Sequence, residues 1–208
     1  MKILRISILL FTLSLSTLVQ AANTKGQYSL CFTPGDNCTE LIIQQIQAAK
    51  TSIYLQAYSF TATSIAKALV KARNKGVKVR VLVDKSQRTP NPHSVVTWLS
   101  RQGIPVWIDQ RPAIAHNKVI IIDNNLVITG SFNFTNSAQQ RNAENVIVIR
   151  DPWVAEQYLT NWQQRQQVST GFVPQPQPEA SWLEKLLSWL EEQLSKFIKK
   201  ELRQMLNS

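Results

Sequence analysis

Short segments rich in valine and isoleucine alternate with amphipathic segments along most of the chain, and this alternation restricts the fold more than any other feature. The short segments have the length and β-branched content of strands, and the expected strands are residues 28–32, 53–58, 77–83, 104–108, 118–122, 126–129 and 145–149. Helices are expected to begin near Thr39 and to span residues 65–75, 94–102 and 152–166. Apolar strands separated by amphipathic helices predict an α/β fold, in which helices flank a mixed β-sheet on both faces.

The first 21 residues have the features of a secretory signal peptide. Lys2 and Arg5 form a short positive region, residues 6–19 carry no charge, and Val19 and Ala21 are the small residues that a signal peptidase reads. A membrane anchor is the alternative, but the uncharged stretch is short for a span of about 20 residues. We therefore expect cleavage after Ala21 and export of the mature protein to the periplasm or the exterior.

The positive charge is concentrated in one part of the sequence. The 208 residues include 23 Lys and Arg against 13 Asp and Glu, which gives a formal net charge of +10. The expected signal peptide, residues 1–21, accounts for two of these charges. The remaining +8 lies within residues 22–178, with 16 basic and 8 acidic residues, whereas residues 179–208 hold five of each. This excess favours an anionic partner, either a nucleic acid or lipid headgroups.

The C-terminal part of the chain differs in composition from the rest. Residues 168–180 alternate proline with glutamine, which favours an extended spacer between two structured parts. Ser181 and Glu184 then fit a capping box, and an amphipathic helix with a wide apolar face is expected over residues 181–208. Its charges balance, so packing on its own domain or on a second copy is the first expectation. Membrane contact through residues 181–206 is the second.

One polar pattern stands out in the middle of the chain. It reads H-x-K-x4-D-x6-G-S-x-N and begins at His116. His116 and Lys118 are two apart on an extended segment, so their side chains point to the same face, and the same holds for Ser131 and Asn133. The expected hairpin brings the two pairs together. An imidazole, an ammonium, a hydroxyl and an amide at one point suit a phosphodiester.

Metal-ligand spacing is absent from the sequence. There are two histidines in the whole chain, and no carboxylate or Cys/His cluster has the spacing of a metal site. We therefore expect a site that works without a metal or another cofactor.

The pattern that begins at His116 resembles the signature motif of the phospholipase D superfamily. The stretches Ala-Tyr-Ser-Phe-Thr at residues 57–61 and Asn-Ala-Glu-Asn at residues 142–145 strengthen the resemblance to small, exported Nuc-type bacterial endonucleases. The resemblance covers about residues 28–167 and implies a phospholipase D-like catalytic domain at residues 22–167. Members of this superfamily cut DNA, RNA, phospholipids or other phosphodiesters, so the motif does not fix the substrate.

The resemblance implies a role for each matching residue. His116 matches the nucleophile that attacks phosphorus and forms a covalent phosphohistidine. Lys118 matches the residue that binds the phosphate oxygens and the charge of the transition state. Asn133 matches a second phosphate ligand and Ser131 a hydroxyl that hydrogen-bonds in the site, while Glu144 matches a carboxylate that orients the histidine.

Two motif positions have an expected structural role. Asp123 is the motif aspartate, but a residue five positions after Lys118 lies on the opposite face, so we expect it to hold the hairpin turn. Gly130 is likewise expected to serve the local structure rather than the chemistry.

A single motif implies a homodimer with a composite active site. Such enzymes use two histidines, one to attack and one to protonate the leaving oxygen, and a twofold dimer supplies the second histidine. The other histidine of this chain, His93, lies in a proline-rich loop outside any motif, and we expect no catalytic role for it.

Other features point to structure. Cys31 and Cys38 flank a tight turn, which in an exported protein favours a local disulfide over two free thiols. Aromatic residues expected in the core, rather than as base-stacking platforms, are Tyr54, Tyr58, Phe60, Trp98 and Trp107. Phe132 and Phe134 alternate with the motif residues and are expected to pack beneath the site.

The sequence thus favours an exported, metal-independent phosphodiesterase that cleaves DNA or RNA as a nonspecific endonuclease. No base-reading element is visible, so cutting is expected to be largely independent of sequence. A phospholipase D that hydrolyses phosphatidylcholine-type lipids by the same chemistry is the alternative among enzymes. An envelope binding module is the alternative outside enzymes, and the intact motif argues against it.

Overall fold

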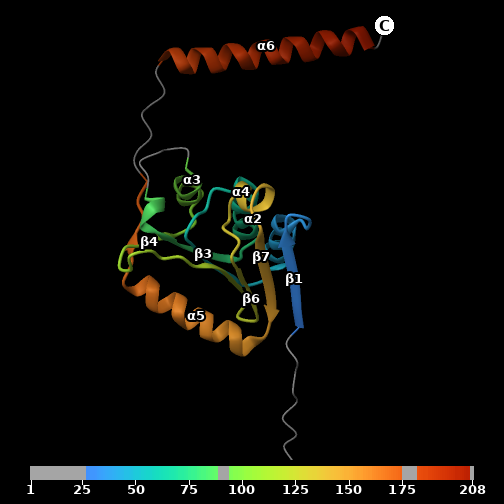
Figure 1. The fold of residues 1–208 in the computed structure, drawn as a ribbon. Helices are drawn as coiled ribbons and strands as arrows, with labels where there is room; N and C mark the ends of the chain where they lie inside the picture. The colour runs from blue at the N-terminus through green and yellow to red at the C-terminus, as the bar shows by residue number, and fades with distance from the viewer. Residues whose placement is uncertain (1–26, 89–93, 175–181, 207–208) are drawn as a thin grey trace, which may run out of the picture.

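The fold is built around one eight-stranded mixed β-sheet (Figure 1). The computed structural model describes residues 27–88, 94–174 and 182–206. Its strands are β1 (Gln27–Thr33), β2 (Ser52–Ala57), β3 (Lys78–Asp84), β4 (Val106–Asp109), β5 (Lys118–Ile122), β6 (Leu126–Gly130), β7 (Glu144–Arg150) and β8 (Thr170–Gly171). Its helices are α1 (Cys38–Ala48), α2 (Thr63–Asn74), the 3₁₀ turn η1 (Lys85–Gln87), α3 (Val95–Arg101), α4 (Asn136–Gln140), α5 (Pro152–Gln167) and α6 (Trp182–Leu206).

The strands follow the order β1-β7-β6-β5-β2-β3-β4-β8 across the sheet. The β2–β3 and β3–β4 pairs are parallel, and all other pairs are antiparallel. This mixture confirms the predicted α/β class. It also brings the end of β2 to the start of β5, because Ala57 pairs with Lys118 in the antiparallel register.

Helices cover both faces of the sheet, and each face has its own apolar core. Figure 1 shows α5 on one side of the sheet and α2, α3 and α4 on the other. On the α5 side, Trp162 is buried against Tyr54 and donates from its indole N–H to the Leu55 carbonyl at 3.0 Å. The larger core lies on the opposite side and includes Ile42, Leu69 and most of the inward-facing strand residues. Burial on both faces explains why the central strands are almost continuously apolar.

Local signals place most element boundaries, with one correction. The sequence suggested Thr39 as the cap of the first helix, whereas Asn37 caps α1 through its side-chain oxygen, which accepts from the Glu40 amide at 3.0 Å. The disulfide predicted between Cys31 and Cys38 is formed and joins β1 to the start of α1. Because Cys38 is the first helical residue, the cap falls one position before it.

The β5–β6 hairpin turns through two residues in the left-handed region, Asp123 and Asn124, with φ of 54° and 52°. The Asp123 carboxylate accepts hydrogen bonds from the amides of Lys50, Thr51 and Ser52 at 2.7–2.9 Å and from the Thr51 hydroxyl at 2.8 Å. Asp123 therefore ties this turn to the loop that enters β2.

The region after α5 differs from the expected linker at its start. Thr170 and Gly171 form strand β8, which pairs with Ile108 and Trp107 of β4, so the sheet continues into residues assigned to the spacer. Helix α6 spans Trp182–Leu206, close to the predicted range, and its apolar side chains are exposed. Among the described residues, no helix combines the length and apolarity needed to cross a membrane. The predicted signal peptide (1–21), His93, and Ser181 of the capping box lie outside the described residues.

Candidate active site

The predicted site residues gather at one end of four neighbouring strands. Lys118 begins β5, Gly130 ends β6 and Glu144 begins β7, and these strands lie side by side with β2 in the sheet. Antiparallel pairing brings the end of one strand beside the start of the next. Residues far apart in the sequence therefore meet at one edge of the sheet.

A hydrogen bond from the Lys118 side chain to the His116 backbone holds these two residues together. The buried ammonium of Lys118 donates to the His116 carbonyl at 2.8 Å, while the His116 side chain is exposed. The ring of Tyr58 lies 4.7 Å from the imidazole centroid, and its centroid is 5.4 Å from the Lys118 ammonium. One aromatic ring therefore contacts both His116 and Lys118, and its electron-rich face favours the cation.

The environment of Lys118 changes its acidity. Burial disfavours the ammonium form and lowers the pKa of Lys118 below its ordinary value, whereas the negative charge of Glu144 acts in the opposite direction. Burial has the larger effect. The side chain is 6% exposed, so its charge is poorly solvated and is available to an anion that enters the site.

Ser131 and Glu144 form a second polar group at the same edge. The Ser131 hydroxyl donates to a carboxylate oxygen of Glu144 at 2.5 Å, and the other carboxylate oxygen accepts from the Asn142 side chain at 2.9 Å. The Ser131 oxygen also accepts from the Asn145 backbone amide at 3.0 Å. The start of β7 is held in turn by Thr33, whose hydroxyl oxygen accepts from the Glu144 amide at 3.1 Å.

Gly130 allows the end of β6 to approach β7. Its φ is +143°, a conformation that favours glycine, and an added Cβ would lie 2.2 Å from the Asn145 carbonyl oxygen. The same carbonyl accepts from the Ser131 amide at 3.1 Å. The glycine therefore sets the position from which the Ser131 hydroxyl reaches Glu144.

Asn133 is flanked in the sequence by two buried phenylalanines, Phe132 and Phe134, which are each 2% exposed. This agrees with the prediction that both rings pack beneath the site. Within the described part of the chain, the Asn133 side-chain oxygen is buried and has no hydrogen-bond partner. A buried oxygen without a partner carries a desolvation cost that a donor from a bound molecule would remove.

The structure joins most, but not all, of the predicted residues. Lys118 contacts His116, and Ser131 contacts Glu144. The charge of Glu144 acts on Lys118, which links the two pairs. The hydrogen bonds of the Glu144 side chain go to Ser131 and Asn142, and none joins it to His116 in the residues described. Tyr58, expected in the core, is half-buried and contacts the site instead. The signal that could have placed it there is its position directly after Ala57, the residue of β2 that pairs with Lys118.

Within residues 27–88, 94–174 and 182–206, no group of three or more His, Cys, Asp or Glu side chains is arranged to hold a metal ion. The polar groups that meet at the sheet edge are instead a lysine, a histidine, a serine and an asparagine, with one carboxylate. These groups suit an anionic ligand.

A family model described as "Cardiolipin synthase, PLD-like domain" matches residues 42–165, more than half of the chain. The chain belongs to the phospholipase D superfamily. The chain is 51% identical to "Phospholipase D" of Rickettsia prowazekii (strain Madrid E) over 148 residues, which cover 71% of this chain and 72% of the relative. It is 30% identical to the human "Mitochondrial cardiolipin hydrolase" over 166 residues, or 74% of this chain and 66% of that protein.

Solved structures support the same assignment. Nuc from Salmonella typhimurium, a phospholipase D family member, matches with a TM-score of 0.65 and 38% identity over 71% of this chain and 99% of its own. NucT from Helicobacter pylori matches with a TM-score of 0.65 and 25% identity over 71% of this chain and 100% of its own. The protein is therefore a phosphodiester hydrolase with the Nuc-type fold.

Proposed function

We propose that the protein is an exported phosphodiesterase that cleaves DNA or RNA without a metal, through a phosphohistidine on His116. The observation that carries the proposal is the pairing of an exposed imidazole with a buried lysine on one aromatic ring. The imidazole is accessible for attack on phosphorus. The lysine charge is fixed where negative charge builds up on the phosphate oxygens.

The proposed reaction has two steps. In the first, a ring nitrogen of His116 bonds to phosphorus, the bond from phosphorus to the leaving oxygen breaks, and a second histidine protonates that oxygen. In the second, water attacks the phosphohistidine and the phosphorus–nitrogen bond breaks, while the second histidine takes a proton from the water. Lys118 and the side-chain NH₂ of Asn133 hold the phosphate oxygens throughout. Ser131 joins them when its hydroxyl proton turns from Glu144 to the phosphate.

The second histidine is proposed to be the partner subunit's His116, in a homodimer with a composite site. An exposed apolar stripe on edge strand β1 offers a surface for the second copy, since Tyr28, Leu30 and Phe32 are each more than half exposed. Phe32 pairs with Asn145, whose amide contacts Ser131, so the stripe begins beside the site. Glu144 is proposed to orient a histidine once the dimer brings an imidazole to it.

The dimer is tested with a substitution on that stripe. Leu30→Glu replaces an exposed side chain, so the domain is expected to fold, while the charge opposes burial between two copies. Light scattering is expected to show a dimer for the wild type and a monomer for the variant. The monomeric variant is expected to be inactive in a phosphodiesterase assay. A wild-type protein that is an active monomer would contradict the composite site.

The excess of basic over acidic residues within residues 22–178 favours nucleic acid as the substrate. Nuc and NucT share the fold and the sequence similarity described above, which also supports this choice. Binding to phosphates releases counterions, so DNA affinity is expected to fall at least about tenfold between roughly 50 and 200 mM salt. Fluorescence anisotropy of a labelled oligonucleotide measures this fall, and a flat response would oppose the proposal.

Export is proposed from the leader-like residues 1–21 and from the Cys31–Cys38 disulfide. Disulfides persist in oxidising compartments such as the periplasm or the exterior. N-terminal sequencing of the protein recovered from fractionated cells tests the prediction that the mature chain begins after Ala21.

A phospholipase D activity is the second candidate, and two observations favour it. The Rickettsia relative of 51% identity is named for this activity. Helix α6 also exposes large apolar side chains along its length, including Trp182, Trp189 and Phe197, which would suit the interfacial region of a membrane.

One experiment separates the two substrates. Purified protein in EDTA is incubated with plasmid DNA, with RNA, and with phosphatidylcholine vesicles. We expect strand cleavage without headgroup release, and no activity from His116→Ala. Headgroup release without strand cleavage would assign the phospholipase activity instead. Turnover by His116→Ala would overturn the mechanism for either substrate.

A further inference from the structure

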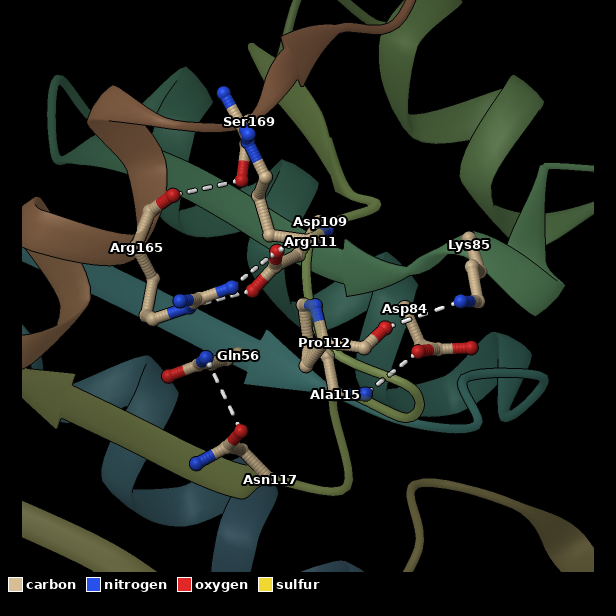
Figure 2. A network of polar contacts seen from close by, with 10 residues as sticks. All are labelled: Gln56, Asp84, Lys85, Asp109, Arg111, Pro112, Ala115, Asn117, Arg165 and Ser169. Atoms are coloured by element: carbon tan, nitrogen blue, oxygen red, sulfur yellow. Dashed lines mark hydrogen bonds and ion pairs between the residues drawn. The ribbon is translucent and has the colours of Figure 1, made fainter.

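The segment that carries His116 has no regular secondary structure and is held by side chains from neighbouring strands. Residues 110–117 connect the end of β4 to the start of β5. Figure 2 shows this connection between two buried carboxylates, Asp84 and Asp109, which are the last residues of the parallel strands β3 and β4. Since the imidazole itself is exposed, its position depends on how firmly this backbone is fixed as well as on the ring of Tyr58.

Asp84 holds the residue directly before His116. Its side chain is 2% exposed, and one carboxylate oxygen accepts from the Ala115 amide at 2.7 Å while the other accepts from the Ser86 amide at 2.8 Å. Burial raises the pKa of Asp84, but these amides and the charge of Lys85 outweigh it, so the pKa is lowered. The ionised carboxylate is thus a strong acceptor for the Ala115 N–H.

Two further contacts fix the segment on either side. The Lys85 ammonium donates to the Pro112 carbonyl at 3.0 Å, and the buried Gln56 side chain donates to the Asn117 side-chain oxygen at 3.2 Å (Figure 2). The Asn117 carbonyl accepts from the Tyr58 amide at 2.8 Å. The backbone is therefore fixed immediately before and immediately after His116.

We propose that Asp84 is a positioning residue for His116. The Asp84 carboxylate fixes the Ala115 amide and thereby sets the direction from which the imidazole attacks phosphorus. Misplacement of a reacting group by about 1 Å can cost roughly 100-fold in rate, so a tether one peptide unit away has a direct kinetic effect. The inference rests on the proposed role of His116 as nucleophile.

Asp109 provides a matched control. It is also fully buried at a strand end, but its carboxylate binds the Arg165 guanidinium of α5 at 2.6 and 2.8 Å and accepts from the Arg111 amide at 3.3 Å. That pair raises the pKa of Arg165 through the hydrogen bond to Asp109. Asp109 therefore anchors α5 and the far end of the segment, five residues or more from the imidazole.

The experiment compares Asp84→Asn with Asp109→Asn on bis(4-nitrophenyl) phosphate, a small phosphodiester that needs neither nucleic acid nor lipid recognition. In Asp84→Asn the new side chain keeps one acceptor oxygen for the two backbone amides, those of Ala115 and Ser86. It presents an NH₂ group, which cannot accept, to the other amide. For Asp84→Asn we expect kcat to fall about 10- to 100-fold with KM changed less than about threefold. Asp109→Asn is expected to lower the melting temperature while its kcat stays within about twofold of wild type.

Mass spectrometry distinguishes the positioning role of Asp84 from the role of His116 as nucleophile. Wild type and both variants are quenched with denaturant at alkaline pH, because the phosphorus–nitrogen bond of a phosphohistidine hydrolyses in acid. An aryl-phosphoryl adduct on His116 establishes the nucleophile, and its rate of formation is expected to fall in Asp84→Asn alone. If the adduct forms equally fast in both variants, the positioning role is wrong although the nucleophile stands. If wild type gives no adduct on His116, both fail. Should Asp84→Asn not fold, Asp84→Glu and Asp109→Glu keep each charge and provide the same comparison.

Discussion

Tyr58 packs its ring on the imidazole of His116, with the two centroids 4.7 Å apart and the planes inclined by 53°. The same ring faces the Lys118 ammonium at 5.4 Å. A residue with no expected role in the chemistry thus contacts both residues that are proposed to attack and to hold the phosphate. We therefore expect the contribution of Tyr58 to depend on the ring rather than on the phenol oxygen.

This relationship predicts different outcomes for two substitutions at Tyr58. Tyr58→Phe keeps the ring and is expected to retain kcat within about threefold, because the stacking contact survives. Tyr58→Ala removes the support of both side chains and is expected to lower kcat by about 10-fold or more. Steady-state kinetics on a small phosphodiester measures both. Equal losses in the two variants would instead assign the effect to the phenol hydroxyl.

The opposing influences on Lys118 predict a pH dependence. Burial lowers the pKa of Lys118 and Glu144 partly offsets this, so activity that needs the ammonium is expected to fall at a lower pH than for an ordinary lysine. Glu144→Gln removes the offset and is expected to move the alkaline limb of kcat/KM further toward neutral pH. A pH–rate profile measures the shift. An alkaline limb that stays in place would show that the lysine charge does not control this limb.

Gly130 is predicted to be intolerant of a side chain. In Gly130→Ala the new Cβ meets the Asn145 carbonyl at 2.2 Å in addition to the unfavourable φ, so we expect a loss of stability above about 4 kcal/mol. Gly35→Ala is the control, because Gly35 also has a positive φ but nothing lies within 4 Å of an added Cβ. That variant is expected to lose about 1–3 kcal/mol. Urea unfolding of both variants provides the comparison, and similar losses would exclude the steric contact as the cause.

Asp123 is predicted to make the fold sensitive to acid. Burial raises the pKa of Asp123, but the bonds from the amides of Ser52, Thr51 and Lys50 and from the Thr51 hydroxyl outweigh it, so the pKa in the folded protein is lowered. The stabilisation is therefore complete above the pKa of the unfolded chain and is lost as the pH falls through the folded pKa.

Asp123→Asn tests this linkage, since the amide keeps one acceptor and loses the charge. We expect a loss of about 1–3 kcal/mol at neutral pH that shrinks as the solution is acidified. Thermal unfolding at several pH values measures the difference from wild type. A difference that is constant with pH would assign the loss to packing rather than to ionisation.

Several parts of the site follow from local sequence signals. The alternation of apolar segments predicted the strand that carries Lys118 and the strand at residues 145–149, which the structure extends by one residue to Glu144, because strand periodicity is a property of neighbouring residues. The turn after Ile122 was likewise predicted, since Asp123 and Asn124 tolerate the left-handed conformation that a tight hairpin needs. The Cys31–Cys38 pairing is also local, because few residues separate the two thiols.

Other parts depended on contacts between distant segments. Strand β8 has two residues and no periodic signal, and it exists because Gly171 and Thr170 pair with β4. Thr39, the expected cap of α1, lies inside the helix, and its backbone amide donates to the Gln139 side chain, 100 positions away. Such choices are made by partners that local propensity does not include.

The sequence by itself determined the chemistry that the site can perform, because the spacing of His116, Lys118, Ser131 and Asn133 places matched groups on extended segments that share a face. Tertiary structure alone decided how that chemistry is held in place. Tyr58 reaches the imidazole, and Asp84 reaches the Ala115 amide, because the parallel strands β2 and β3 end at the same edge as the antiparallel start of β5. Strand order is set by burial of the whole sheet between its helices, and no single stretch of sequence contains that information.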